Sequence, residues 1–364
     1  MHRRVVLVWV GGVRVTFHAT LVPVCPSGFF GRPIWPRISA TDGARADTSR
    51  RMRSLVLLLV LFLAHSVPVA AQSEPHLLIV IGDSWAAGWG SHTGTVPAGT
   101  PKELPGVKVW NRWYSDLRFS NLAHTDSWET LRRDCALKSD LTMNGPAPVF
   151  EFANRYRQLT GVTTLYVIQF GFPGSDVVPN MLPQPGIRCP QPGGSTWDPA
   201  QSSTPWILFR DHYLQPALAS LPNNTVRFAG VAFSLGNNAG FQAGYCGQVA
   251  LFDGAMDRLL SNIGLQLGVT TVPATGYVPH LDPTAQPYAN NMPTLAAMQA
   301  EKLAWPSAYN FGAVLDCRPF PTGYFPLATN DPYHLNALGY LRLGEELATT
   351  HVGLVSGLVL PLIP

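Results

Sequence analysis

The fold is decided by the stretch LLIVIGDSWAAG, Leu77–Gly88. Its five leading apolar residues, three of them β-branched, are typical of a strand buried on both faces of a parallel sheet. The Gly-Asp-Ser sequence that follows predicts a strand-to-helix turn with Ser84 exposed at the carboxyl end of the strand, where α/β sheets carry their functional residues. The N-terminus of the expected helix would favour developing negative charge beside Ser84.

The rest of the chain continues this alternation of short apolar strands and amphipathic helices. We expect further strands at Val107–Trp110, Thr164–Phe170 and Val226–Leu235, and helices near Val149–Leu159, Val249–Leu267 and Leu338–Thr349. This order predicts a three-layer α/β/α sandwich with a central, mostly parallel sheet. Two segments rich in proline and glycine, Pro179–Pro205 and Val272–Pro306, are interpreted as loops over one edge of that sheet.

The composition is that of a folded chain, because 46% of its 364 residues are apolar and only 13% are charged. No internal repeat or long linker divides residues 72–364, so we expect them to form a single domain. Residues 52–71 combine a basic start, the apolar run Leu55–Ala64 and small residues at the end. This pattern predicts a secretory signal peptide that is cleaved near Ala71, and the run is shorter than the roughly 20 apolar residues that span a bilayer.

Residues 1–51 precede the predicted signal peptide and are rich in proline and arginine, without a periodic pattern. We interpret them as an over-extended N-terminus outside the mature fold; the alternatives are a long basic leader or a signal anchor. Without residues 1–71 the chain has 16 basic and 20 acidic residues, so its formal net charge becomes −4 instead of +3. This charge disfavours a nucleic-acid partner.

Export also changes the expected state of the cysteines. Cys25 leaves with the prefix, and the mature chain keeps Cys135, Cys189, Cys246 and Cys317. None of them shows the spacing of a zinc or redox motif, and an oxidising compartment favours disulfides. We therefore expect two disulfides with the pairing left open. The alternative is four buried free thiols.

The far end of the chain supplies an acid and a base for Ser84. Asp331 and His334 are separated by two residues, and the apolar-periodic segment LNALGYLRLGEELA follows them. Within one turn the Asp331 carboxylate can hold the Nδ1 atom of His334, while Nε2 faces a serine hydroxyl that needs a general base. The structural alternatives are that Ser84 and Asp331 only cap helices and that His334 is a surface residue.

These blocks, in this order, resemble the SGNH or GDSL hydrolases, and within them the sialate O-acetylesterase-like carbohydrate esterases. The resemblance rests on Gly82-Asp83-Ser84, on Gln169–Val177, on Phe233–Asn238 and on Asp331-x-x-His334, and it covers Leu77 to about Ala348. It implies a flavodoxin-like sandwich and a catalytic triad of Ser84, His334 and Asp331. The implied oxyanion hole consists of the Ser84 and Gly174 amides and the Asn238 side chain.

One block departs from the carbohydrate-esterase branch. That branch usually has Gln-Gly-Glu where this chain has Leu235-Gly236-Asn237, so the expected glutamine amide is missing at Leu235. An alignment with the broader family's Gly-x-Asn block offers Asn238 as the donor instead. The alternative is that Asn237 and Asn238 only close the strand in a turn, since asparagine favours such positions.

Tryptophans, histidines, cysteines and glycines are the remaining candidates for binding roles. Trp85 and Trp197 are candidates for stacking on a sugar at the rim of the site, although a tryptophan is more often packed in the interior. The histidines and cysteines show no metal-ligand spacing, and the glycines after the first strand lack a nucleotide-binding spacing, so we expect no metal and no cofactor. The apolar segment Val352–Pro364 is too short for a membrane anchor and should pack on the core.

The sequence therefore predicts a secreted serine esterase that removes acetyl or other small acyl groups, and the resemblance implies that it removes them from a carbohydrate. One alternative is a lipid or general carboxylester hydrolase of the same fold. Another, of a different class, is a non-catalytic carbohydrate-binding protein on a decayed esterase scaffold, which the missing glutamine and glutamate at Leu235 and Asn237 keep open.

Overall fold

The computed structural model describes residues 3–10, 13–20, 74–111, 126–135, 145–173, 175–178, 196–201, 204–222, 226–237, 248–279, 292–329, 331 and 333–363. The chain divides into two compact units, Met1–Val69 and Ala70–Pro364. The predicted signal peptide, residues 52–71, lies outside the described residues.

The first unit contains an antiparallel pair of strands, β1 (Arg3–Val10) and β2 (Val13–Thr20). We assign no strand to residues 1–51 from the sequence, and the structure has this pair there. Its sequence signal is the Gly-Gly dipeptide between two valine-rich runs, which is typical of a two-residue hairpin connection. Whether residues 1–51 belong to the mature protein stays a prediction.

The second unit is built on a seven-stranded sheet with the strand order β5-β4-β6-β3-β7-β8-β9. The strands are β3 (His76–Gly82), β4 (Glu103–Asn111), β5 (Ser127–Arg132), β6 (Leu165–Gly171), β7 (Arg227–Ser234), β8 (Ala274–Val278) and β9 (Gly312–Asp316). All pairings are parallel except that of β4 with β5. The expected stretch Leu77–Ile81 forms the central strand β3, because both of its faces are buried.

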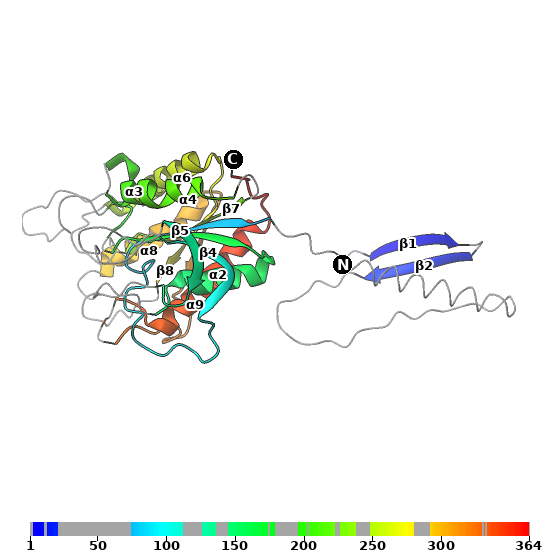
Figure 1. Cartoon of the computed structure of the whole chain (residues 1–364), viewed down its shortest axis with the longest axis horizontal. Helices are drawn as coiled ribbons and strands as arrows, with labels where there is room; N and C mark the ends of the chain where they lie inside the picture. The colour runs from blue at the N-terminus through cyan, green and yellow to red at the C-terminus, as the bar shows by residue number, and fades with distance from the viewer. Residues whose placement is uncertain are drawn as a thin grey trace, which may run out of the picture. The chain divides into compact units, whose positions relative to one another are not determined.

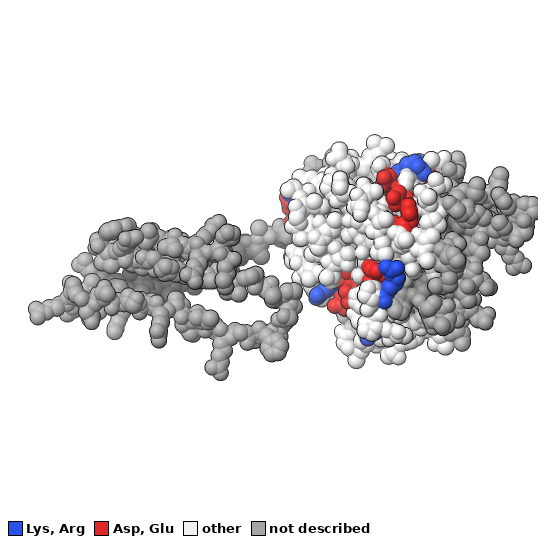
Figure 2. Space-filling view, turned by 180° about the vertical axis from the view of Figure 1, so that it is seen from behind, with Lys and Arg blue, Asp and Glu red and all other residues white. Residues whose placement is uncertain are grey.

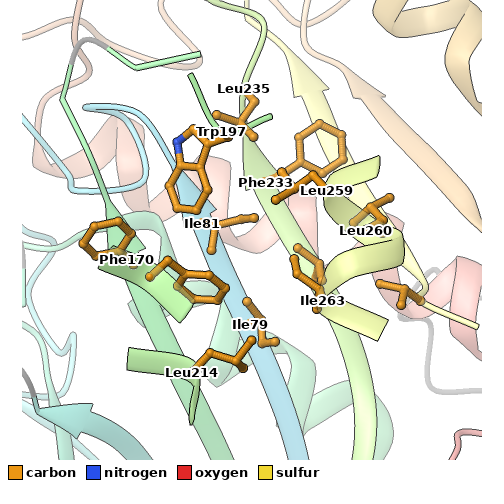
Figure 3. Close-up of a cluster of buried hydrophobic side chains, with 14 of the residues drawn as sticks. Ile79, Ile81, Phe170, Trp197, Leu214, Phe233, Leu235, Leu259, Leu260 and Ile263 are labelled. Carbon is orange, nitrogen blue, oxygen red and sulfur yellow. The ribbon is translucent and has the colours of Figure 1, made fainter. Parts of the chain in front are cut away.

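Helices cover both faces of this sheet (Figure 1), as predicted. One face packs against α2 (Pro148–Thr160) and α9 (Ala337–Val355), and the other against α6 (Phe252–Leu267), α8 (Met292–Ala308) and the segment α3 (Thr204–Leu208), η2 (Phe209–Leu214) and α4 (Gln215–Ala219). Alternate residues of β3 serve the two cores: Ile79 and Ile81 join the α6 side, whereas Leu78 and Val80 join the α2 and α9 side. Figure 3 shows Ile79 and Ile81 among the buried side chains of the α6 side.

The ends of the helices follow local sequence signals. Helix α2 starts with Pro148 and stops at Gly161, whose left-handed φ of 73° lets its N–H bond back to Arg157. Helix α9 begins at Asn336, whose side chain accepts a hydrogen bond from the Gly339 N–H at 3.0 Å. The predicted helices at Val149–Leu159 and Leu338–Thr349 are confirmed, and these signals account for where α2 ends and α9 begins.

The interpretation of Val272–Pro306 as a loop is wrong, because this segment contains β8 and most of α8. Strand β8 is short and includes Gly276, where a Cβ atom would collide with the Phe233 ring, so its glycine reflects close packing and not a turn. Pro293 lies in the first turn of α8, where proline is tolerated, and Pro306 lies inside the helix, near its end. Of Pro179–Pro205, the described residues include a short 3₁₀ turn, η1 (Pro199–Gln201).

The predicted docking of the C-terminal apolar segment on the core is confirmed. Phe228 donates its N–H to the Pro361 carbonyl at 2.8 Å, and Ile363 donates to the Val226 carbonyl at 2.9 Å. These bonds attach the segment to the beginning of β7. None of the helices in the described ranges has the length and apolar character needed to cross a bilayer.

Two of the four predicted disulfide cysteines are free thiols. Cys135 and Cys317 are both buried in the core on the α2 and α9 side, and neither is bonded to another cysteine. The expectation of two disulfides is therefore wrong, and the alternative of buried thiols holds for this pair. Burial raises the pKa of Cys135 to about 12, so the reactive thiolate is suppressed. Cys189 and Cys246 lie outside the described residues.

Charged side chains form small groups on the face shown in Figure 2, most of them pairing a basic residue with an acidic one. The remainder of the described surface in this view is uncharged, in keeping with the 13% charged residues of the chain. The described part of this face presents no extended basic surface of the kind that binds a polyanion.

The contact between α2 and α9 predicts a large difference between two glycines of one helix. A Cβ at Gly344 would lie 2.8 Å from the Phe152 nitrogen and still closer to the Pro148 carbonyl oxygen, whereas a Cβ at Gly353 would meet nothing within 4 Å. Gly344→Ala should lower the free energy of unfolding by about 1–3 kcal/mol, as overpacking does. Gly353→Ala should raise it by about 0.5–1 kcal/mol through helix propensity. Urea unfolding of the two variants measures both; equal effects would contradict the tight helix contact.

Candidate active site

The turn after β3 places Ser84 next to the end of β7. Gly82 has a φ of 152°, and a Cβ there would lie 2.5 Å from the Ser234 carbonyl oxygen. The same oxygen accepts a hydrogen bond from the Asp83 N–H at 3.0 Å. Only glycine permits this approach, so the local sequence fixes where the chain leaves the sheet. Ser84, 8% exposed, follows directly.

The helix expected after Ser84 is absent from the described residues, and this prediction is wrong. Successive turns occupy the segment: Gly88 N–H donates to the Trp85 carbonyl at 3.0 Å, and Trp89 N–H to the Ser84 carbonyl at 2.9 Å. Gly88 and Gly90 have φ values of 73° and 89°, which interrupt a right-handed helix. Within the described part of the chain, no group accepts a hydrogen bond from the Ser84 N–H. That amide can therefore serve a ligand.

His334 and Asp331 lie on a short hairpin immediately before α9. Leu327 bridges Leu335 across it, and Ala328 N–H donates to the His334 carbonyl at 2.8 Å. The Asp331 Oδ1 atom accepts from the backbone N–H groups of Tyr333 at 2.9 Å and His334 at 3.2 Å. These bonds hold the carboxylate and the imidazole on the same side of the hairpin.

The three residues form a continuous hydrogen-bonded series. Asp331 Oδ2 lies 2.7 Å from His334 Nδ1, and His334 Nε2 lies 2.8 Å from Ser84 Oγ. A proton on Nδ1, held by the carboxylate, leaves Nε2 as an acceptor for the serine hydroxyl. The hypothesis that these residues only cap helices or lie on the surface therefore does not describe their arrangement. The site has the geometry of a nucleophile, a base and an orienting acid.

The Asp331 carboxylate is kept ionised by its partners. Burial by itself would raise the pKa of Asp331, but the hydrogen bond and charge of His334, with the two backbone N–H donors, lower it below its usual range. An ionised Asp331 can stabilise the imidazolium that forms when His334 takes a proton.

A buried polar network lies beside this series, and sequence reasoning missed most of it. Ser234 Oγ donates to Asp83 Oδ1 at 2.6 Å and lies 2.9 Å from the Tyr277 hydroxyl. Asn237 Nδ2 donates to Ser234 Oγ at 3.3 Å, and Lys302 Nζ donates to Asn237 Oδ1 at 2.9 Å. No local signal pointed to this network, because Tyr277 and Lys302 belong to the segment interpreted as a loop, and Lys302 directly follows Glu301 in the sequence.

The remaining predicted residues divide into two groups. Gly174 and Asn238, the expected oxyanion donors besides Ser84, lie outside the described residues. Trp85 and Trp197 are 3% and 0% exposed, so their prediction as stacking residues at the rim is wrong. Trp85 packs against the rings of Tyr277 and Tyr340, and Trp197 donates its indole N–H to Ser175. They form the interior instead.

Trp89 borders the site. Its ring centroid lies 6.5 Å from that of His334, and the residue is partly exposed. The Tyr340 hydroxyl donates to the Trp89 carbonyl at 2.7 Å, which fixes the backbone of this turn on α9. No cluster of three or more His, Cys, Asp or Glu side chains able to hold a metal occurs among the described residues.

No protein-family model matches this sequence, and no curated protein matches it. The solved structures that share the fold of this chain include two that cover most of it. A protein of Arabidopsis thaliana has a TM-score of 0.54 at 13% identity, over 77% of this chain and 98% of its own. The protein NanS has a TM-score of 0.51 at 12% identity, over 80% of this chain and 100% of its own. With the strand order above, these likenesses confirm the predicted three-layer α/β/α architecture, which is the fold of the SGNH hydrolases.

Two glycines in this region test whether the position of His334 controls the reactivity of Ser84. A Cβ at Gly90 would lie 2.8 Å from the His334 Cβ, whereas Gly99, with a similar φ of 88°, has nothing within 4 Å of such an atom. Gly90→Ala should slow the labelling of Ser84 by a fluorophosphonate at least about tenfold, since small displacements in a reacting pair are costly. Gly99→Ala carries the same backbone strain without the collision and should label at nearly the wild-type rate. Equal slowing in both variants would contradict the role of His334.

Proposed function

We propose that this chain is a serine esterase that removes acetyl or other small acyl groups. The observation that carries the proposal is the unbroken series from Asp331 through His334 to Ser84, with distances of 2.7 and 2.8 Å. A serine hydroxyl is a weak nucleophile at neutral pH, and this arrangement is the one that activates it for attack on a carbonyl.

In the first step, Ser84 Oγ forms a bond to the ester carbonyl carbon while its proton passes to His334 Nε2. The carbonyl oxygen takes the displaced electron pair and becomes an oxyanion. The Ser84 N–H supports this charge, and we assign Gly174 N–H and the Asn238 side chain to the same oxyanion hole. One such donor contributes about 3 kcal/mol of transition-state stabilisation.

The tetrahedral intermediate then collapses, and the bond from carbon to the leaving alcohol oxygen breaks. His334 gives its proton to that oxygen, so the alcohol leaves neutral and Ser84 remains acylated. A water molecule repeats the sequence: His334 takes its proton, the hydroxide attacks the acyl carbon, and Ser84 leaves with the proton returned by His334. Asp331 stays ionised throughout and stabilises the imidazolium in both halves of the reaction.

We propose that the alcohol is a carbohydrate hydroxyl. The resemblance of the ordered sequence blocks to the carbohydrate-esterase branch supports this substrate class, and the partly exposed Trp89 ring beside His334 offers an apolar face for a sugar. We include in this proposal that the chain is exported after cleavage near Ala71. Export would bring the enzyme to a polymeric substrate outside the cell.

The first test is loss of the nucleophile. Ser84→Ala should reduce hydrolysis of p-nitrophenyl acetate at least about a thousandfold, because the remaining residues supply only transition-state binding. Ser356→Ala removes an exposed hydroxyl at the end of α9 and should leave the rate unchanged. Equal rates for Ser84→Ala and wild type would remove the proposed mechanism and favour a non-catalytic protein.

The second test is the substrate class. Acetate release from acetylated polysaccharides and acetylated sialic acids should exceed hydrolysis of p-nitrophenyl esters with acyl chains of eight or more carbons, since a long chain gains binding free energy only where a site buries its methylene groups. Acetate measured enzymatically and p-nitrophenol measured by absorbance give the two rates. A preference for the long chains would identify a lipid or general carboxylester hydrolase instead.

A further inference from the structure

Three ionisable side chains lie fully buried next to the turn that carries Ser84. Lys302 and Asp83 are each 1% exposed and Asp176 is 0% exposed. Lysine and aspartate are almost never buried without partners, because removing a charge from water is costly. The mechanism above gives no role to the ammonium group of Lys302, and its burial therefore requires a separate explanation.

The contacts of Lys302 lead to the end of β7. Its Nζ atom donates to Asn237 Oδ1 at 2.9 Å and lies 5.3 Å from the centre of the Tyr277 ring. Asn237 in turn donates a hydrogen bond from Nδ2 to the Ser234 hydroxyl. That hydroxyl donates to the Asp83 carboxylate at 2.6 Å. The ammonium on α8 is thus joined by side chains to the residue that precedes the proposed nucleophile.

Asp176 holds the same turn from the opposite side. Its Oδ1 atom accepts hydrogen bonds from the Gly236 N–H at 2.7 Å and from the Val177 N–H at 2.6 Å. The Gly236-Asn237 turn is therefore bonded through its backbone to Asp176 and through its side chain to Lys302. Gly236 has a φ of 85°, and its backbone would be strained for other residues.

The buried charges of Lys302 and Asp83 stabilise each other. Burial lowers the pKa of Lys302 to about 8, and attraction to Asp176 and Asp83 opposes that shift. Burial raises the pKa of Asp83 to about 6, opposed by its bonds to Ser234 and Trp85 and by Lys302. Each of these two groups therefore favours the charged form of the other, and removing either one would leave a buried charge without its partner.

The network touches each of the three segments that contain a proposed oxyanion donor. Asp83 directly precedes Ser84, Asp176 follows Gly174 by two residues, and Asn237 directly precedes Asn238. We infer that Lys302 is a positioning residue: through Asn237 and the two aspartates, its buried ammonium sets these segments at the spacing that an oxyanion requires. This inference rests on the proposed esterase function.

The test removes the charge of Lys302 with little change in volume. In Lys302→Met, kcat for p-nitrophenyl acetate should fall at least about tenfold with KM within about twofold, because loss of a well-placed oxyanion donor acts on the transition state. Hydrogen exchange of the amides in 234–237 should become faster than in wild type. Lys102→Met, which changes an exposed lysine, should alter neither quantity.

Two further variants separate positioning from simple loss of stability. Ile263→Ala removes a buried side chain from α6 and should lower the melting temperature without changing kcat of the folded enzyme. Asn237→Ala breaks the same contact from the loop side without removing a charge, so it keeps the test open if Lys302→Met does not fold. It should lower kcat and accelerate exchange in the same direction.

The inference is overturned if folded Lys302→Met, or Asn237→Ala in its place, keeps kcat within twofold of wild type. Unchanged exchange at 234–237 overturns it as well, whatever the activity. Absence of esterase activity in the wild-type protein would instead refute the proposed function, and the exchange experiment would still decide whether Lys302 holds the turn.

Discussion

The site depends on the close approach of two neighbouring strands at their carboxyl ends. At Gly82 the backbone of β3 passes so near the Ser234 carbonyl of β7 that no side chain fits between them. This contact sends the chain over the end of the sheet at a fixed angle, and Ser84 follows within two residues. The neighbouring strands β6 and β7 bring Asp176 and Asn237 to the same edge, since parallel strands end together. The position of Ser84 is thus set by the packing of the backbone at Gly82 and Ser234, and not by contacts of its own side chain.

The residues at the carboxyl ends of the central strands and the proposed base, His334, come from different parts of the chain. His334 and Asp331 belong to a local hairpin, where spacing in the sequence settles their contact, and α9 carries that hairpin against the sheet. Tight packing of α9 on α2 at Gly344 therefore matters to the distance between His334 and Ser84. Helix α9 thus supports the proposed base, and the sheet supports the proposed nucleophile.

Local patterns explain what could be predicted from the sequence. The apolar run before Ser84 indicated the central strand, and the spacing of Asp331 and His334 indicated their hydrogen bond, because both are decided within a few residues. Long-range packing could not be seen in this way. Gly276 and Pro306 resembled loop residues, although one sits under Phe233 and the other near a helix end. The burial of Trp85, Trp197 and Lys302, and the free thiols of Cys135 and Cys317, follow from tertiary neighbours that no local pattern contains.

The proposed nucleophile and base are separated by 250 positions, and the segment after α9 pairs with β7. A loop of this length must close before the two side chains can meet, which costs conformational entropy. The contact between Ser84 and His334 is therefore a property of the folded domain, and it is lost whenever the hairpin before α9 leaves the sheet.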